Sequence, residues 1–240
     1  MKKKYIIIIV SYLVLVFSAY SVMFLKNTFN NSGAGGSALE VITFNNDLGL
    51  EHIMDKYIKV FNNKKKYTLV NEPLDQNLSD VAVIYESHLR DFKSDEYTKD
   101  EVASDNVILT VSKKNSVVNL TGNQLEDILS GKINSWKNLN GKDERIIVVT
   151  DMTGYNYLSK KFENISSVNL IRNADINYFV KDDEYVIQII HASLFSIESK
   201  EITLDNFAPD DYEKYPLQDP VILVYKNKYI DLFKNIDLLR

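Results

Sequence analysis

Short apolar runs, most of them rich in Val and Ile, alternate with amphipathic segments from residue 38 onward. Polar or turn-forming residues bound each run, which is the pattern of a short buried strand. The pattern predicts strands at Ala38–Phe44, Tyr67–Val70, Asp80–Tyr85, Asn106–Ser112, Arg145–Thr150, Glu184–Ile190 and Pro220–Lys226.

The segments between these runs indicate helices. After the first strand, the apolar positions fall on one helical face, at Leu50, Ile53, Met54, Tyr57, Ile58 and Phe61. Asn46 or Asp47 would be the N-cap of this helix, because Asn and Asp are favoured there. Further helices are expected at 124–130, about 157–164 and about 229–239. Strands that alternate with helices predict an α/β fold with mostly parallel sheets.

The stretch "NLTGNQLEDILSGKINSW", Asn119–Trp136, contains a helix start and a helix stop close together. Thr121 and Gln124 have the spacing of a capping box, in which each side chain bonds the other residue's backbone N–H. Gly131 can adopt the left-handed conformation that ends a helix. Trp136 would then pack against an apolar surface. The buried helical face would consist of Leu125, Ile128 and Leu129.

The first 26 residues decide the expected location of the protein. Three lysines precede the uncharged stretch Tyr5–Leu25, which as a helix would span about 31 Å, close to one bilayer core. Lysines on the N-terminal side predict that this end stays inside and that the rest lies outside. Two interpretations remain open: an uncleaved signal anchor, or a signal peptide cleaved near Ala19–Ser21.

A Gly-rich polar segment, residues 27–38, follows and reads as a flexible linker. The folded domain would begin near Leu39. With an anchor, the protein is a single-pass protein of the cell membrane with its domain on the extracytoplasmic side; with a cleaved signal peptide, it is secreted.

Composition and motifs exclude several classes of function. The 240 residues carry a net charge of −5 and no cysteine, so thiol catalysis and Cys-ligated zinc are excluded and a basic nucleic-acid footprint is lacking. His52, His88 and His191 are scattered without metal-ligand spacing. No nucleophile or nucleotide-binding motif is present. We therefore expect neither an enzyme nor a cofactor, a metal or a nucleic-acid partner.

The central stretch resembles a known family. "LTGNQLEDILSGKINSWKNLNG" followed by "IIVVTD" is similar to a segment typical of the phosphate-binding proteins of ABC importers. Upstream "NVILTVSKKNSVVN" and downstream "NFAPDDYEKYPLQDPVILVYKN" follow the same family pattern in order. The central positions in register are Leu120, Thr121, Gln124, Leu125, Ile128, Gly131, Ile133, Trp136 and Gly141.

The resemblance implies a two-lobed clamshell of the periplasmic-binding-protein type II class, with a ligand held between the lobes. Residues 39–113 and 193–240 would form the first lobe, and residues 114–192 the second. A receptor of this kind closes by hinge motion and presents its closed form to a permease. The expected partners are therefore a small ligand and an ABC permease or another protein of the cell envelope.

The resemblance also locates the candidate site in turns that follow strands. In the family these turns hold phosphate through hydroxyls, backbone N–H groups and arginine, which suit an anion. Here Asp47, Glu86 and Asp151 bring negative charge to these turns, so we predict weak or absent phosphate binding. The cleft candidates are Asn45, Asn46, Asp47, Tyr85, Glu86, Thr150, Asp151, Thr153, Gly154 and Tyr155.

Three interpretations of this changed cleft remain open. It could hold another polar or cationic ligand, with the protein acting as a solute receptor. It could belong to an interaction or sensory module of the cell envelope that has lost its ligand. Or its residues could merely close and solvate an inactive cleft.

Overall fold

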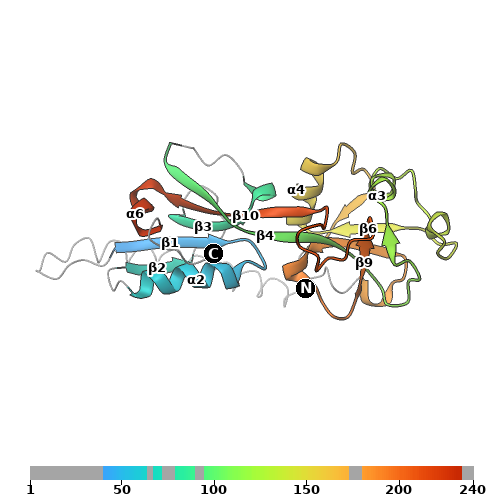
Figure 1. Cartoon of the computed structure of the whole chain (residues 1–240), viewed down its shortest axis with the longest axis horizontal. Helices are drawn as coiled ribbons and strands as arrows, with labels where there is room; N and C mark the ends of the chain where they lie inside the picture. Colours follow the sequence, from blue (N-terminus) through green and yellow to red (C-terminus); the bar gives the residue numbers. More distant parts are fainter. Residues whose placement is uncertain (1–39, 64–66, 72–78, 90–94, 173–179, 234–240) are drawn as a thin grey trace, which may run out of the picture.

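The structure is a computed structural model that describes residues 40–63, 67–71, 79–89, 95–172 and 180–233. Figure 1 shows an elongated molecule in which two groups of helices and strands are joined by long strands. The expected signal or anchor segment, residues 1–26, and the linker, residues 27–38, lie outside the described residues. Within the described ranges, no helix combines the length and apolar character needed to cross a membrane.

The strands form a mixed sheet with the order β2-β1-β3-β10-β4-β8-β6-β7, and β9 pairs with both β4 and β5. Pairing is parallel toward the two ends, as in β1–β2 and β6–β7, and antiparallel where β10 meets β3 and β4. The expectation of a mostly parallel sheet therefore holds only away from the centre. The bounds are β1 (Glu40–Asn46), β2 (Tyr67–Asn71), β3 (Val81–Tyr85), β4 (Tyr97–Val111), β5 (Asn119–Leu120), β6 (Ile147–Thr150), β7 (Val168–Leu170), β8 (Val186–His191), β9 (Lys200–Leu204) and β10 (Gln218–Lys226).

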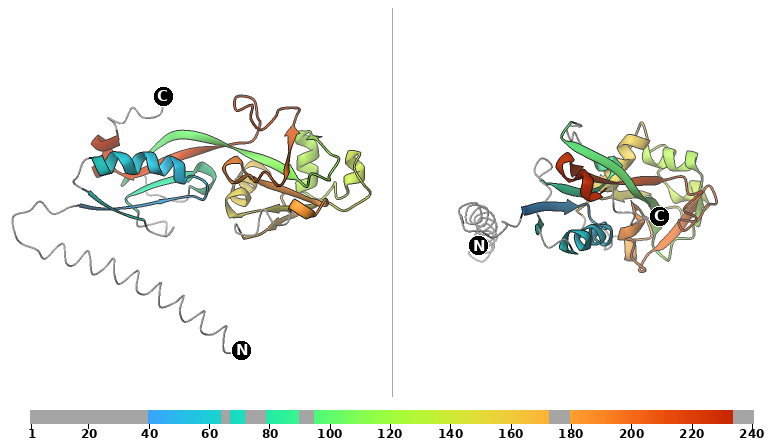
Figure 2. Two further views of the ribbon diagram at one scale, coloured as in Figure 1. Left: turned by 90° about the horizontal axis from the view of Figure 1, so that it is seen from below. Right: turned by 60° about the vertical axis from the view of Figure 1, so that its left-hand side comes forward.

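Strand β4 connects the two lobes. It is 15 residues long, and its first part pairs with β10, whereas Val107–Val111 pair with β8. Figures 1 and 2 show β4 and β10 running side by side between the lobes. The sequence pattern found only the second part of β4, because the first part, "YTKDEVASD", is mostly polar.

The helices fill out the two lobes. Helix α2 (Glu51–Asn63) lies along the first lobe, and α3 (Gly122–Leu129) and α4 (Met152–Lys161) lie in the second. The short elements are η1 (Glu86–His88), η2 (Trp136–Leu139), η4 (Ala192–Leu194), η5 (Asn227–Tyr229) and α6 (Ile230–Phe233). Helix α4 begins five residues before the expected start at 157, because Asp151 caps it.

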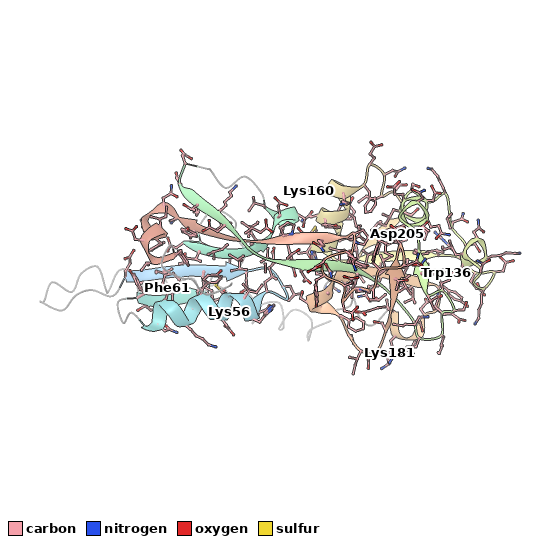
Figure 3. The ribbon with its side chains drawn as sticks, in the orientation of Figure 1. Lys56, Phe61, Trp136, Lys160, Lys181 and Asp205 are labelled. Atoms are coloured by element: carbon pink, nitrogen blue, oxygen red, sulfur yellow. The ribbon has the colours of Figure 1, made fainter. Side chains whose placement is uncertain are left out.

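Each lobe has its own apolar core. In the first lobe, the predicted stripe of α2 packs on β1, β3 and β10, and the second core gathers around α3, β6 and β8. Figure 3 labels Phe61 in the first lobe and Trp136 in the second. The second core also takes in Val107–Val111 of β4, Ile202 and Leu217, which the sequence-based boundaries assign to the first lobe.

One N-cap expectation is wrong. Helix α2 begins at Glu51, and the backbone N–H of Met54 donates to the carbonyl of Leu50, so neither Asn46 nor Asp47 caps it. The carboxylate of Asp47 instead accepts from the backbone N–H of Tyr85, which lies on a neighbouring strand.

The predicted unit around α3 is confirmed. The backbone N–H of Gln124 donates to Oγ1 of Thr121 at 3.2 Å, and the N–H of Thr121 donates to Oε1 of Gln124 at 2.9 Å. Gly131 has φ 80°, in the left-handed region. Trp136 is 1% exposed, and its Nε1 donates to the carbonyl of Tyr185 at 3.0 Å.

Replacing the cap should weaken this unit measurably. We expect Thr121→Ala to lower the free energy of unfolding by about 1 kcal/mol, because one backbone N–H of the first helical turn loses its acceptor. Urea denaturation followed by circular dichroism measures the change. Glu126→Ala, an exposed position on the same helix, is the control and should stay within about 0.5 kcal/mol of the wild type. Equal stability of Thr121→Ala and wild type would contradict the prediction.

Candidate functional site

The ends of β3 and β8 meet where the two lobes join. The ring of Tyr85 stacks on that of His191 with centroids 3.7 Å apart and an interplanar angle of 23°. Tyr157 of α4 meets the same imidazole edge-on at 6.4 Å. Tyr85 and His191 are both fully buried. The aromatic stack thus lies where the two lobes meet and includes Tyr85, one of the predicted cleft candidates.

Asp47 fixes the turn after β1 to the end of β3. Its Oδ2 accepts from the backbone N–H of Tyr85 at 2.8 Å, and its Oδ1 lies 2.6 Å from Nδ1 of His88. The residue is 1% exposed. A buried carboxylate needs such donors, since burial without them is costly. Both carboxylate oxygens of Asp47 are therefore used within the first lobe.

The phenol of Tyr85 links the first lobe to the segment after β8. Its hydroxyl donates to Oδ2 of Asp105 at 3.0 Å and lies 2.9 Å from Oγ of Ser193. Burial and the negative charge of Asp105 raise the pKa of Tyr85 well above its usual range. The phenol accordingly stays protonated and acts as a hydrogen-bond donor.

Asp219, at the start of β10, is the most heavily bonded carboxylate of the junction. It accepts from the backbone N–H of Ser87 at 3.0 Å, from the Ser87 hydroxyl and from Nε2 of His191 at 3.0 Å. Because a carboxylate only accepts, Nε2 of His191 carries the proton. Asp219 therefore joins η1 of the first lobe to β8 of the second.

The N-terminus of α4 is closed by its own cap. Asp151 is fully buried; its Oδ1 accepts from the backbone N–H of Gly154 at 2.8 Å and its Oδ2 from the hydroxyl of Thr153 at 2.9 Å. The hydroxyl of Thr150 donates to the carbonyl of Ile189 at 2.7 Å. A helix N-terminus attracts anions. Here a carboxylate of the chain itself takes that place.

The structure divides the sequence-predicted candidates into two groups. Asp47 and Tyr85 are in direct contact in the first lobe, whereas Thr150, Asp151, Thr153 and Gly154 cluster at α4 in the second. The ammonium of Lys160 bridges the lobes by donating to the backbone carbonyl of Glu86 at 3.0 Å.

The remaining candidates lie around these groups. The amide of Asn45 donates to the hydroxyl of Ser79 at 2.7 Å, and that of Asn46 donates to the carbonyl of Asp47 at 2.9 Å. Glu86 is exposed and Tyr155 is half-buried. The hydrogen bonds of Asn45 and Asn46 stay within the first lobe and do not reach the cluster at α4.

Sequence reasoning missed several members of the junction. It treated His88 and His191 as isolated, and it did not single out Ser87, Asp105, Ser193 or Asp219. The contact between Ser87 and Asp219 spans 132 positions, so no local spacing could reveal it. The one available signal was a polar residue at the end of an apolar strand, as in "VIQIIH". Across the described ranges, no group of three or more His, Asp or Glu side chains could hold a metal ion.

Removing the Asp219 carboxylate should destabilise the protein strongly. We expect Asp219→Ala to lower the free energy of unfolding by about 2–4 kcal/mol, because buried donors of Ser87 and His191 lose their acceptor. Urea unfolding followed by tryptophan fluorescence measures the change. The control, Asp143→Ala, removes the exposed ion pair with Lys137 and should leave the unfolding midpoint unchanged. A midpoint shift no larger than that of the control would contradict the prediction.

Known proteins resemble this chain in sequence and in fold. A family profile described as the PBP superfamily domain matches residues 55–235. Phosphate-binding proteins PstS of Staphylococcus epidermidis and Staphylococcus aureus are each 32% identical over 94 residues, which is 37% of this chain and 29% of the relative. The matched part thus spans under a third of the length of these relatives.

Solved structures support the same fold. A protein from Clostridium perfringens solved with bound phosphate superposes with a TM-score of 0.64 at 21% identity, covering 79% of this chain and 87% of its own. An ABC-type phosphate transport receptor from Vibrio cholerae gives 0.62 at 19% identity, covering 79% and 88%. The two-lobed α/β fold expected from the sequence is confirmed. The chain belongs to the periplasmic-binding-protein (PBP) superfamily, and phosphate-binding proteins of ABC importers are among the members to which its sequence and fold are similar.

Proposed function

We propose that this chain is a membrane-tethered, extracytoplasmic domain of the solute-binding type whose interlobe site does not hold phosphate. The tether is the apolar N-terminal segment, residues 1–26, and the domain is secreted if that segment is cleaved. The domain performs no covalent chemistry. Its partners are an ABC permease or another envelope protein, in line with the names of its relatives.

A single observation carries this proposal: the chain's own carboxylates already use the donors that an anion would need. The backbone N–H groups of Tyr85, Ser87 and Gly154 donate to Asp47, Asp219 and Asp151, respectively. Phosphate would have to displace each carboxylate and then remain beside it. Two like charges 4 Å apart repel by on the order of 4 kcal/mol at an effective dielectric constant of about 20.

The donors that surround the buried carboxylates also argue against phosphate binding. On Asp47, Asp105 and Asp219 they come from backbone N–H groups, hydroxyls and imidazoles. These donors are already used by carboxylates of the chain itself, so they are not available to a second anion. The candidate residues Asn45, Tyr85 and Thr153 then bond other residues of the chain instead of phosphate.

A second function, a ligand-free interaction or sensory module, is favoured by the contacts between the lobes. The Tyr85–His191 stack and the Lys160–Glu86 bond join the lobes through contacts of the chain itself. A clamshell that closes by its own contacts presents one fixed surface to a partner, whereas a receptor presents a surface that depends on its ligand.

Phosphate titration tests the proposal directly. We expect the full chain, purified in detergent, to show neither saturable heat by calorimetry nor a thermal shift with 1 mM phosphate. A ligand at 100 times its dissociation constant stabilises a protein by about 2.7 kcal/mol, so real binding would be visible. The staphylococcal phosphate-binding protein PstS is the positive control. Saturable, micromolar binding of phosphate by this chain would overturn the proposal.

A further inference from the structure

The turn after β1 approaches η4 so closely that only glycine fits at Gly49. This residue has φ 88°, and a Cβ atom there would lie 2.3 Å from Oγ and 3.0 Å from Cβ of Ser193. The Oγ of Ser193 is itself held 2.9 Å from the hydroxyl of Tyr85. The next residue in the turn, Leu50, belongs to the core of the first lobe, whereas Leu194 of η4 packs on the core of the second. Glycine at this point thus allows a close contact between the lobes.

A second contact between the lobes joins η1 to α4 and β8. The ammonium of Lys160 on α4 donates to the backbone carbonyl of Glu86 at 3.0 Å. Asp219 accepts from Ser87 of η1 and from His191 of β8. Figure 1 shows α4 above β10, and α2, which follows the turn after β1, below β4. The two contacts therefore lie on different sides of the strands that connect the lobes.

Together these contacts oppose rotation of the lobes about β4 and β10. Proteins of this fold close around a ligand by hinge motion of their lobes. A rotation that separates η1 from α4 breaks the bond of Lys160 and presses the turn after β1 into η4, where Gly49 leaves no room. A rotation in the opposite sense pulls this turn away from η4 and breaks the hydrogen bond between Tyr85 and Ser193. Both senses of the hinge motion are thus unfavourable.

We propose that these two contacts lock the lobes in one relative position, so that the domain does not undergo the hinge motion of a solute receptor. The lock goes beyond the proposed function, because it concerns the motion of the lobes and not the ligand between them. A solute shifts a conformational equilibrium only by binding one state better than the other. A locked domain has one such state, so the surface that an envelope protein meets is set by the fold alone.

Distances between spin labels in the two lobes test the lock. The chain has no cysteine, so Lys56→Cys on α2 and Glu126→Cys on α3, both exposed positions, carry the only labels. Pulsed double electron–electron resonance on the detergent-purified full chain should give a single interlobe distance, with and without phosphate. Its distribution should be as narrow as that of a reference pair within the second lobe, at Glu126 and Glu198. Two interlobe distances, or a distribution clearly broader than that of the reference pair, would overturn the lock.

A substitution at Gly49 sharpens the test. Gly49→Ala inserts a Cβ between the turn after β1 and η4, so we expect it to shift the interlobe distance. Gly131→Ala is the matched control, because Gly131 also has a positive φ, of 80°, and a Cβ there would lie 2.5 Å from Oγ of Ser167, within the second lobe. It should keep the wild-type distance. Circular dichroism shows whether each variant is folded. Equal distances in two folded variants would refute the lock, and if Gly49→Ala does not fold, the wild-type measurement decides.

A phosphate titration of the same labelled chain separates the two proposals. Saturable phosphate binding at one unchanged interlobe distance overturns the proposed function and supports the lock. More than one interlobe distance without phosphate binding overturns the lock and leaves the proposed function standing.

Discussion

Three buried carboxylates that the chain must satisfy by itself organise the junction between the lobes. Asp47, Asp151 and Asp219 are each at most 1% exposed, and each accepts hydrogen bonds from a backbone N–H. Leaving a carboxylate buried without such donors would cost several kcal/mol, so the surrounding turns are held in the conformations that point these N–H groups inward. The turns after β1, β3 and β6 are thereby fixed from within.

The same carboxylates use backbone N–H groups where the lobes join. Backbone N–H groups at strand ends and helix starts are the usual donors for a bound anion. In this chain they donate to internal carboxylates, and the rings of Tyr85 and His191 stack where the lobes join. Lys160, Lys161 and Glu86 lie beside this junction and line an open cavity.

Sequence reasoning succeeded where the signal was local. The capping box of Thr121 and Gln124, the stop at Gly131 and the apolar stripe of α2 all depend on residues a few positions apart. It failed where a polar segment became a strand, as in the first part of β4 and in β9, because pairing with neighbours outweighs local preference there. The sequence predicted Asp47 as a cap of α2, because that helix follows closely along the chain. In the structure its carboxylate instead accepts from the backbone N–H of Tyr85 on the neighbouring strand.

The sequence by itself determined the strands with strong apolar runs, the resemblance to a family of the PBP superfamily and the presence of acidic residues in the expected binding turns. Periodicity, caps and motifs carry that information because they join residues within one element. Only the tertiary structure decided which donors those acids use, since Asp47 meets a residue 38 positions away and Asp219 one 132 positions away. Contacts of that range depend on how the sheet is ordered and how the lobes meet, which no spacing along the chain records.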